Sequence, residues 1–258
     1  LCRKFYKKSQ YGRPSMAPGV YFRALLIGYF EGLDSERGIA WRTADSLSLR
    51  EFLGYGLDEQ TPDHSTISRT RRLYWVETHK AVFRWVIKLL VEEGLLSGQT
   101  ISIDATTLEA NAAMKSIVRR DNGQSYDEYL KGLAKAAGME NPSREQLARL
   151  DRKRKKKGSN EEWKSPTDPD ARITRMKDGR THLAHKAEHA VDLSSGALLA
   201  VTLQAADAGD TTTIQQTVAE AQAVASRVNE RGVEEVVADK GYHSGQVLQN
   251  LHQEAIRT

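Results

Sequence analysis

The chain has 258 residues, of which 39% are hydrophobic and 28% charged, and its formal net charge is +4. This composition excludes a disordered chain and a disulfide framework, because a sizeable core can form and Cys2 is the single cysteine. The mildly basic charge is typical of some nucleic-acid-binding proteins, and the apolar stretches are interrupted by charges before the roughly 20 residues of a membrane span, so we expect a cytoplasmic protein without membrane association.

The first part of the chain has helical spacing. Pro18 can open a helix that ends near Gly32, and the glycine-punctuated stretch after it predicts short helices with tight corners. The spacing then predicts one helix from Pro62, with Thr61 as its N-cap, to Gly94 or beyond.

The start of that helix, "DHSTISRTRR", combines hydroxyl and arginine side chains. Preceded by short helices, it is typical of a helix-turn-helix recognition helix, whose first residues enter the major groove of DNA. An exposed helix that packs on the following domain is the alternative. The candidate DNA-binding residues are Ser65, Ser68, Arg69, Arg71 and Arg72.

At residue 100 the period changes to that of a strand. Ile101 and Ile103 alternate with Ser102 and Asp104 in "TISIDATTLEANAA". We expect the polar segment of about 107–180 that follows to be an insertion that is helical in part and partly flexible. Its stretch 141–172 lacks a core-forming pattern. Its basic run could be a solvated segment or could neutralise DNA phosphates, and we favour DNA contact. The run comprises Arg152, Lys153, Arg154, Lys155, Lys156 and Lys157.

Strands return from residue 181. "THLAHKAEHAVDL" and "ALLAVTLQA" predict a hairpin, an amphipathic helix capped by Thr211 or Thr212 follows, and "EEVVAD" predicts a buried strand. This order indicates an α/β domain with antiparallel strands. We expect Asp207 and Asp210 to cap the helix and Lys186 to lie on the surface.

Three histidines of the first hairpin strand, His182, His185 and His189, raise the question of a zinc site with Glu188. Strand geometry turns His185 and His189 to one face and His182 and Glu188 to the other, so we expect no convergence on a metal.

Two aspartates end predicted core strands. Asp104 follows Ile-Ser-Ile, and Asp239 follows Val-Val-Ala. Each could cap a turn, or the two could meet and share divalent cations, because Mg²⁺ favours one or two carboxylates together with water and phosphate oxygens. Two such ions about 4 Å apart can support phosphoryl transfer.

A family resemblance rests on ordered motifs: "SIDATTLEANAA", "DPDAR", "HLAHKAEHAVDLSSGALLAV", "DAGDTTT" and "VADKGYHS". Together they resemble the transposases of bacterial insertion sequences of the IS4/IS5 superfamily, particularly its IS1182-like branch. The resemblance implies an α/β, RNase H-like catalytic domain with a DDE acidic triad, preceded by an all-helical DNA-binding domain. It covers nearly the whole chain.

The resemblance assigns residues 1–97 to DNA binding and 98–258 to catalysis with two Mg²⁺ or Mn²⁺ ions. Asp104 and Asp239 match the first and second acids as catalytic and metal-binding residues. The resemblance places Lys240 near the active site, where it is a candidate DNA-binding residue, and a solvated turn is the alternative. The third acid belongs on a helix after a further strand. Glu254 comes too early to match it, so we expect a C-terminally incomplete catalytic domain.

The expected function is a DNA transposase that cleaves and transfers strands at the ends of an insertion sequence, with this chain inactive alone. The implied partners are double-stranded DNA, as terminal inverted repeats and target, and further copies of the chain, in a bacterial cytoplasm near the nucleoid. Two alternatives remain open: a truncated, non-catalytic DNA-binding repressor of transposition, and a metal-dependent nuclease of the same fold.

Overall fold

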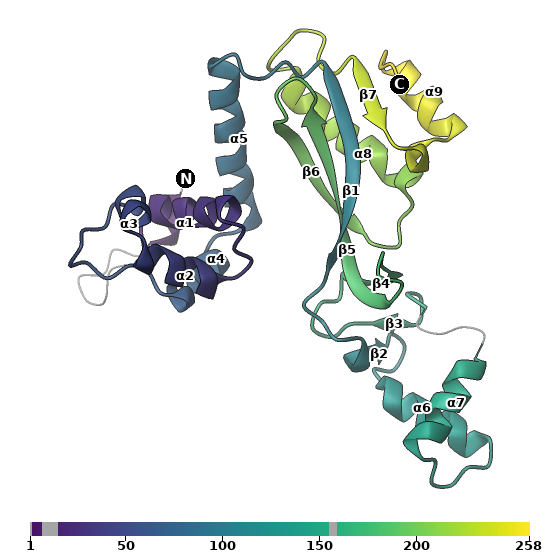
Figure 1. The fold of residues 1–258 in the computed structure, drawn as a ribbon. Coiled ribbons are helices and arrows are strands. Elements are labelled where there is room, and N and C mark those ends of the chain that lie inside the picture. Colours follow the sequence, from purple (N-terminus) through teal and green to yellow (C-terminus); the bar gives the residue numbers. More distant parts are fainter. Residues whose placement is uncertain (1, 7–14, 155–158) are drawn as a thin grey trace. The chain divides into compact units, whose positions relative to one another are not determined.

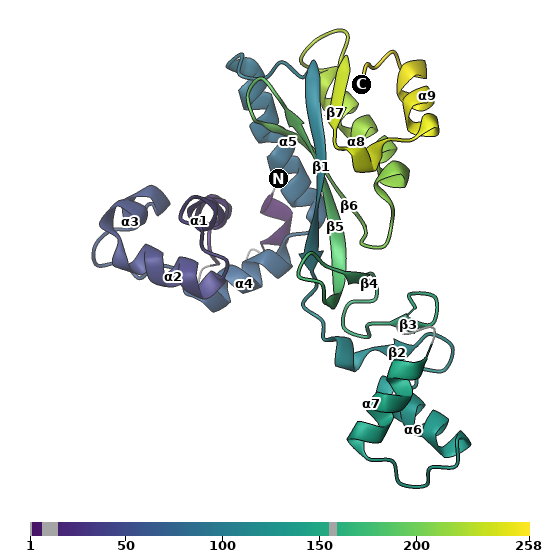
Figure 2. The same cartoon turned by 45° about the vertical axis from the view of Figure 1, so that its right-hand side comes forward.

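The computed structural model describes residues 2–6, 15–154 and 159–258. It forms two compact units, unit 1 over Leu1–Leu89 and unit 2 over Leu90–Thr258. The described elements of unit 1 are helical, and unit 2 combines a sheet with helices (Figures 1 and 2). The expected class, an α/β unit preceded by an all-helical one, is therefore confirmed. Within the described residues, none of the helices has the length and hydropathy needed to cross a membrane.

Unit 1 is built from short helices around an aromatic core. Ser35, Ser46 and Asp63 cap three of the helices through side-chain oxygens that accept backbone N–H groups. The core includes Tyr21, Ile27, Ile39, Leu53, Ile67 and Tyr74. The helices are η1 Cys2–Phe5, α1 Pro18–Phe30, α2 Glu36–Asp45, α3 Leu47–Leu53, α4 His64–Leu73 and the start of α5 Val76–Glu92.

The single helix predicted from Pro62 to Gly94 was wrong. Asp63 rather than Thr61 is the N-cap, and the helix is broken at Tyr74, whose backbone is extended. The break turns the Tyr74 ring into the core, where it stacks on Phe22 at 5.9 Å between ring centroids. Burial of this aromatic ring outweighs the propensity for one continuous helix.

Unit 2 is organised around the long strand β1. In the five-stranded sheet β1 pairs antiparallel with β5 and parallel with β7, and β5 also pairs antiparallel with β4 and β6. The sheet thus combines antiparallel and parallel strands, in agreement with the predicted α/β domain with antiparallel strands. The strands are β1 Thr100–Glu109, β4 Arg172–Arg175, β5 Thr181–Asp192, β6 Leu198–Ala205 and β7 Glu235–Ala238.

The sheet carries its apolar side chains on the face that α8 (Asp210–Ala225) covers. Ile101 and Ile103 are buried, as the alternation predicted, and the predicted hairpin of β5 and β6 is confirmed. Asp192 at the end of β5 is fully buried and accepts hydrogen bonds from Ser194 and Ser195, both at 2.6 Å. Burial pushes the pKa of Asp192 upward, but these hydrogen bonds outweigh it and lower the pKa.

The start of α8 differs from the prediction, and the chain after the last helix returns to the sheet. Gly209 is the N-cap of α8, so neither Thr211 nor Thr212 caps it. Asp207 instead accepts a hydrogen bond from Asn160 at 3.0 Å. Helix α9 (Gly245–Gln253) ends before Glu254, and Arg257 then forms a parallel bridge with Glu235 of β7. The polypeptide after α9 therefore returns to the sheet.

The segment between β1 and β5 contains small cores that its polar composition concealed. One surrounds Trp163, and the other joins Leu130, Ala134 and Leu147. Capping boxes at Ser125 and Ser143 begin its two helices. The expectation that the segment is helical in part is confirmed. The prediction that residues 141–172 lack a core-forming pattern was wrong, because Leu147 and Trp163 belong to these cores. Its elements are η2 Met114–Ser116, β2 Val118–Arg119, α6 Tyr126–Ala136, α7 Arg144–Lys153 and β3 Trp163–Lys164.

Candidate active site

Strand register brings the two candidate acids together. Ile103 of β1 pairs with Ala238 of β7 in a parallel ladder, and Asp104 and Asp239 are the next residues of the two chains. Neighbouring strands are about 4.8 Å apart, and side chains at matching positions share a face. The register therefore places Asp104 and Asp239 at neighbouring positions, one residue beyond the last pair of the ladder.

Both carboxylates are accessible and only partly engaged by the protein. Asp104 and Asp239 are exposed. The Asp104 Oδ1 atom accepts the N–H of Ala105 at 2.8 Å. Asp239 is the N-cap of the short helix η3 (Lys240–Tyr242), and its Oδ1 accepts the N–H of Gly241 at 2.8 Å. The turn-capping interpretation thus holds for Asp239 and leaves its other oxygen available.

A third carboxylate reaches the same turn from α8. A Cβ on Gly241 would lie 2.9 Å from Asp210 Oδ2 and 2.9 Å from Asp239 Oδ1. Asp210 does not cap its helix as predicted, because its Oδ1 accepts a hydrogen bond from Lys186 Nζ at 2.5 Å. Asp210 and Asp239 therefore approach each other across a space that only glycine leaves free.

Lys186 was predicted to lie on the surface, and that prediction was wrong. It is 5% exposed, on the face of β5 covered by α8, and it contacts Asp210 and Glu188. The sequence signal was present in "HKAEH", where a lysine and a glutamate two residues apart must share one strand face. Because the small apolar residues Ala184 and Ala190 flank the pair on that face, a buried charge pair could have been inferred.

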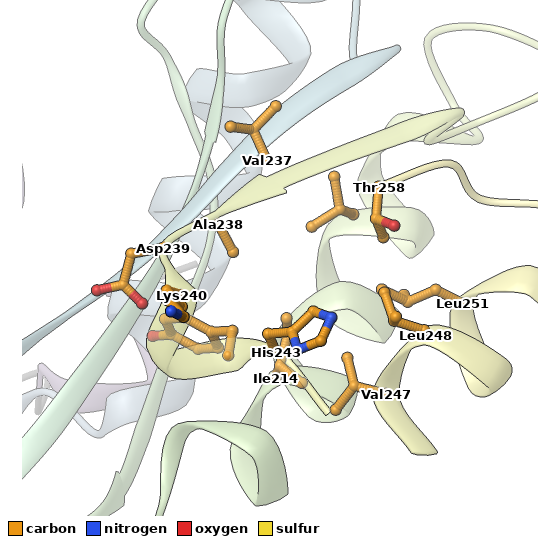
Figure 3. A pocket seen from close by; sticks show the side chains of 12 residues that line it. Ile214, Val237, Ala238, Asp239, Lys240, His243, Val247, Leu248, Leu251 and Thr258 are labelled. Atoms are coloured by element: carbon orange, nitrogen blue, oxygen red, sulfur yellow. The ribbon is translucent and has the colours of Figure 1, made fainter. Parts of the chain in front are cut away.

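An apolar cavity of about 670 Å³ lies beside the second acid. Its walls come from β7, α8 and α9, and include Val236, Ile214 and Leu251 (Figure 3). Asp239 stands at its edge with the carboxylate turned away from the apolar side chains, while His243 points into it (Figure 3). The acid pair therefore opens away from this cavity.

The donor set of the pair fits a hard divalent cation. Carboxylate oxygens suit Mg²⁺ and Mn²⁺, and Mg²⁺ needs only one or two carboxylates when water and phosphate oxygens complete its shell. Within the described parts of the chain, His, Cys, Asp and Glu side chains nowhere form a group of three or more that could hold a metal. A metal here would depend on Asp104, Asp239 and ligands from outside the protein.

The candidate residues of unit 1 lie together on α4. Ile67 and Thr70 face the core, whereas Arg69 and Arg72 are exposed. Arg69 donates to Ser65 at 3.0 Å, and Arg71 forms an ion pair of 2.9 Å with Glu36. Ser68 is half-buried on the same helix.

The remaining basic candidates belong to unit 2. Arg152 and Lys153 are exposed on the last turn of α7, and Arg154 contacts Asp151 at 3.1 Å and the ring of Tyr129 at 5.0 Å. Lys155, Lys156 and Lys157 lie outside the described residues. Lys240 is exposed in η3, directly after Asp239.

The three histidines of β5 have separate surroundings. His182 contacts Glu109 at 2.6 Å and Asp178 at 3.2 Å, and the hydrogen bond with Glu109 raises the pKa of His182. His185 contacts Asp168 at 2.9 Å. These carboxylate contacts bind the strand to the adjoining loops.

The turn at Gly241 gives a testable prediction. Gly241→Ala should displace η3 and weaken Mn²⁺ binding about tenfold, because the added methyl group would overlap two carboxylates. Gly245→Ala is the matched control, since a Cβ there meets nothing within 4 Å. Titration of Mn²⁺ followed by electron paramagnetic resonance compares the two variants, and equal affinities would contradict the prediction.

Comparison with protein families gives two matches. Residues 1–73 match a family described as a transposase domain (DUF772), and residues 97–257 match the transposase DDE domain. A comparison with curated proteins gives no match. The second family alone accounts for more than half of the chain.

Solved structures give a weaker likeness. A pre-cleavage Mos1 transpososome is 10% identical, with a TM-score of 0.29, 98% of this chain covered and 61% of that chain. A Mos1 mariner paired-end complex with Mn is 12% identical, with a TM-score of 0.28 and coverages of 99% and 62%. The chain thus spans about three fifths of the length of these proteins, and TM-scores this low do not establish a shared fold.

Proposed function

This chain belongs to the transposase DDE domain family, and we propose that it acts in cutting and joining DNA at the ends of an insertion sequence. The observation that carries the proposal is the register of β1 and β7, which sets Asp104 beside Asp239. Asp104 lies within β1 rather than at its end, and Asp239 directly follows β7. Both carboxylates are exposed, and such a pair can hold divalent cations against DNA phosphates.

The proposed chemistry is in-line attack on phosphodiesters, first by water and then by a freed 3′-hydroxyl. Two Mg²⁺ or Mn²⁺ ions held by Asp104 and Asp239 would activate the attacking oxygen and stabilise the leaving one. The protein's own contribution is to fix both carboxylates: β1 holds Asp104, and the η3 turn holds Asp239 through the N–H of Gly241. Lys240 at the same turn would contact a nearby phosphate.

DNA would be held mainly by unit 1. The proposed contacts lie on α4, supported by the basic run that begins at Arg152 in unit 2. They are Ser65, Ser68 and Arg69, together with Arg71 and Arg72 in the last turn of the helix. Cutting at two ends of one element requires two sites, so we propose a homo-oligomer on the terminal repeats. The protein would then reside at the nucleoid.

A supercoiled plasmid that carries the element's two ends tests the proposal. The protein expressed from its full reading frame, incubated with Mg²⁺, should nick at the ends and produce joined products. Nicks without joined products would instead indicate a nuclease, and end binding without any nick would indicate a non-catalytic DNA-binding protein. Omission of the metal is the control for each product.

The α4 face gives a second prediction. The double variant Arg69→Ala/Arg72→Ala should weaken binding to the element's ends and reduce the slope of log K against log salt by about 2, because each lost phosphate contact contributes about 0.9. Fluorescence anisotropy over a range of salt concentrations measures the slope. Arg227→Ala/Arg231→Ala removes the same charge from unit 2 and should leave the slope unchanged. An unchanged slope in the α4 variant would exclude this face as the DNA contact.

A further inference from the structure

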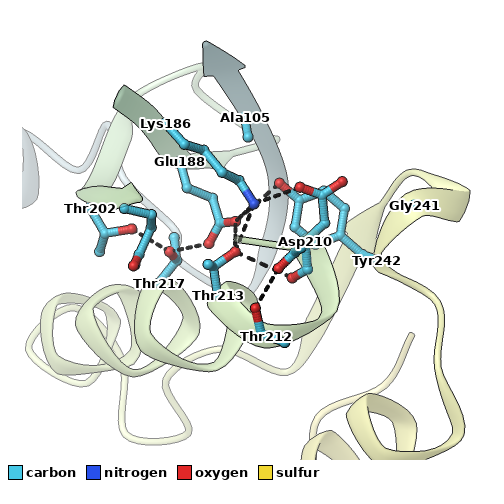
Figure 4. A network of polar contacts seen from close by, with 12 residues as sticks. Ala105, Lys186, Glu188, Thr202, Asp210, Thr212, Thr213, Thr217, Gly241 and Tyr242 are labelled. Carbon is cyan, nitrogen blue, oxygen red and sulfur yellow. Dashed lines mark hydrogen bonds and ion pairs between the residues drawn. The ribbon is translucent and has the colours of Figure 1, made fainter. Parts of the chain in front are cut away.

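A buried polar network joins β5, α8 and η3 (Figure 4). Lys186 and Glu188 are 5% and 0% exposed. Lys186 Nζ donates to Asp210 Oδ1 at 2.5 Å and to Thr213 Oγ1 at 2.8 Å, and lies 3.4 Å from Glu188 Oε1. Burial of two charged groups costs free energy, so a buried ion pair is retained only where hydrogen-bond partners compensate both charges.

Glu188 is well satisfied by hydroxyl groups. Thr213 donates to its Oε1 at 2.6 Å, Thr217 donates to its Oε2, and Tyr242 OH donates to Oε1 at 3.2 Å. The first two come from α8, and the third comes from η3. Glu188 is therefore an anchor point at which the sheet, the helix and the turn after Asp239 meet.

Tyr242 is fixed both by burial and by charge. It is 3% exposed, and Lys186 Nζ lies 5.8 Å from the centre of its ring. Burial raises the pKa of Tyr242, and the charges of Glu188 and Asp210 raise it further. The phenol thus stays protonated and keeps its hydrogen available for Glu188.

Backbone hydrogen bonds within η3 connect Tyr242 directly to Asp239, the second acid. Tyr242 N–H donates to the carbonyl oxygen of Asp239 at 3.2 Å, and Gly241 N–H donates to Asp239 Oδ1 at 2.8 Å. One turn of 3₁₀-helix therefore links the buried phenol to the exposed carboxylate. Movement of the ring would rotate this turn and, with it, the carboxylate.

We propose that Tyr242 is a positioning residue for Asp239, which it holds in register with Asp104 through its hydrogen bond to buried Glu188. The inference rests on the proposed function in one respect only, namely that the positioned carboxylate binds a divalent cation. Tyr242 itself does not contact the cation or the DNA in this scheme.

The test compares two variants, each of which lacks one buried hydroxyl group of this network. Tyr242→Phe removes the hydrogen bond to Glu188 and keeps the ring. Thr202→Val removes the hydrogen bond of 2.6 Å between Thr202 and Thr217 on the far side of Glu188, and touches no part of η3. Both are measured at a temperature where each variant is folded by circular dichroism. The two readouts are Mn²⁺ titration by electron paramagnetic resonance and hydrogen–deuterium exchange of residues 239–243.

Tyr242→Phe should weaken Mn²⁺ binding about tenfold, as loss of an outer partner of a metal ligand typically does, and should speed exchange at residues 239–243. Thr202→Val should change neither. Equal effects in both variants, or wild-type exchange and affinity in Tyr242→Phe, would overturn the inference. If even the unsubstituted protein binds no Mn²⁺ while Tyr242→Phe alone speeds exchange, the proposed function fails and the positioning role stands.

Discussion

Asp239→Asn and Asp104→Asn are each expected to abolish DNA nicking and to weaken Mn²⁺ binding by roughly 100-fold, or about 2.7 kcal/mol. Each substitution keeps the size of the side chain and removes one of the two negative charges that the register of β1 and β7 brings together. Neither residue belongs to the proposed DNA-contact face of α4, so affinity for the element's ends should stay near that of the unsubstituted protein.

The measurements are Mn²⁺ titration, nicking of a supercoiled plasmid and anisotropy with end DNA. Glu220→Gln, on the exposed side of α8, removes one charge elsewhere in unit 2 and is the matched control. Unchanged metal affinity in both aspartate variants would refute the site. If a variant loses both binding to the element's ends and cleavage, it is misfolded or the acids contact DNA directly.

Lys186→Met should lower the free energy of unfolding by about 3–5 kcal/mol, because the substitution leaves Glu188 buried without its cation. Asp210 loses its partner in the same step. Urea denaturation with linear extrapolation measures the change. Lys131→Met, which removes an exposed ion pair with Asp127, is the control and should remain close to the unsubstituted protein.

A second substitution tests the cause of that loss. Lys186→Met/Glu188→Gln removes both buried charges, so it should be more stable than Lys186→Met alone. A loss below about 1 kcal/mol in the single variant, the range of exposed ion pairs, would contradict the assignment of a buried pair. The assignment would also be contradicted if the double variant lost as much free energy of unfolding as Lys186→Met and Glu188→Gln lose together.

The strands and their acids were predictable because local patterns determine them. The alternation around Ile101 and Ile103 predicted strand β1 and placed Asp104 on the opposite face. The apolar run before Asp239 predicted strand β7, but the expectation that this strand is buried was wrong, because β7 is an edge strand with Val237 and Ala238 exposed. Local patterns did not predict that the two acids are neighbours, because the register of two strands more than 100 residues apart is set by tertiary structure. The family resemblance supplied that link.

Other features could not be predicted for physical reasons. The helix ends at Tyr74 because burial of its ring in the aromatic core is favourable, and the spacing of apolar residues does not indicate this burial. The long polar segment forms its cores from few residues, such as Trp163, which periodicity overlooks. Asp210 resembled a helix cap in sequence and is instead engaged by Lys186, a contact set by packing of α8 on β5.

The buried network also constrains how this protein can change over generations. Lys186, Glu188 and Tyr242 depend on one another, so a lineage that loses one of them passes through a less stable intermediate. We therefore expect relatives either to retain all three or to have replaced them together with apolar residues. The separate stretches "HKAEH" and "DKGYH" should accordingly be inherited as one unit, although 49 residues lie between them.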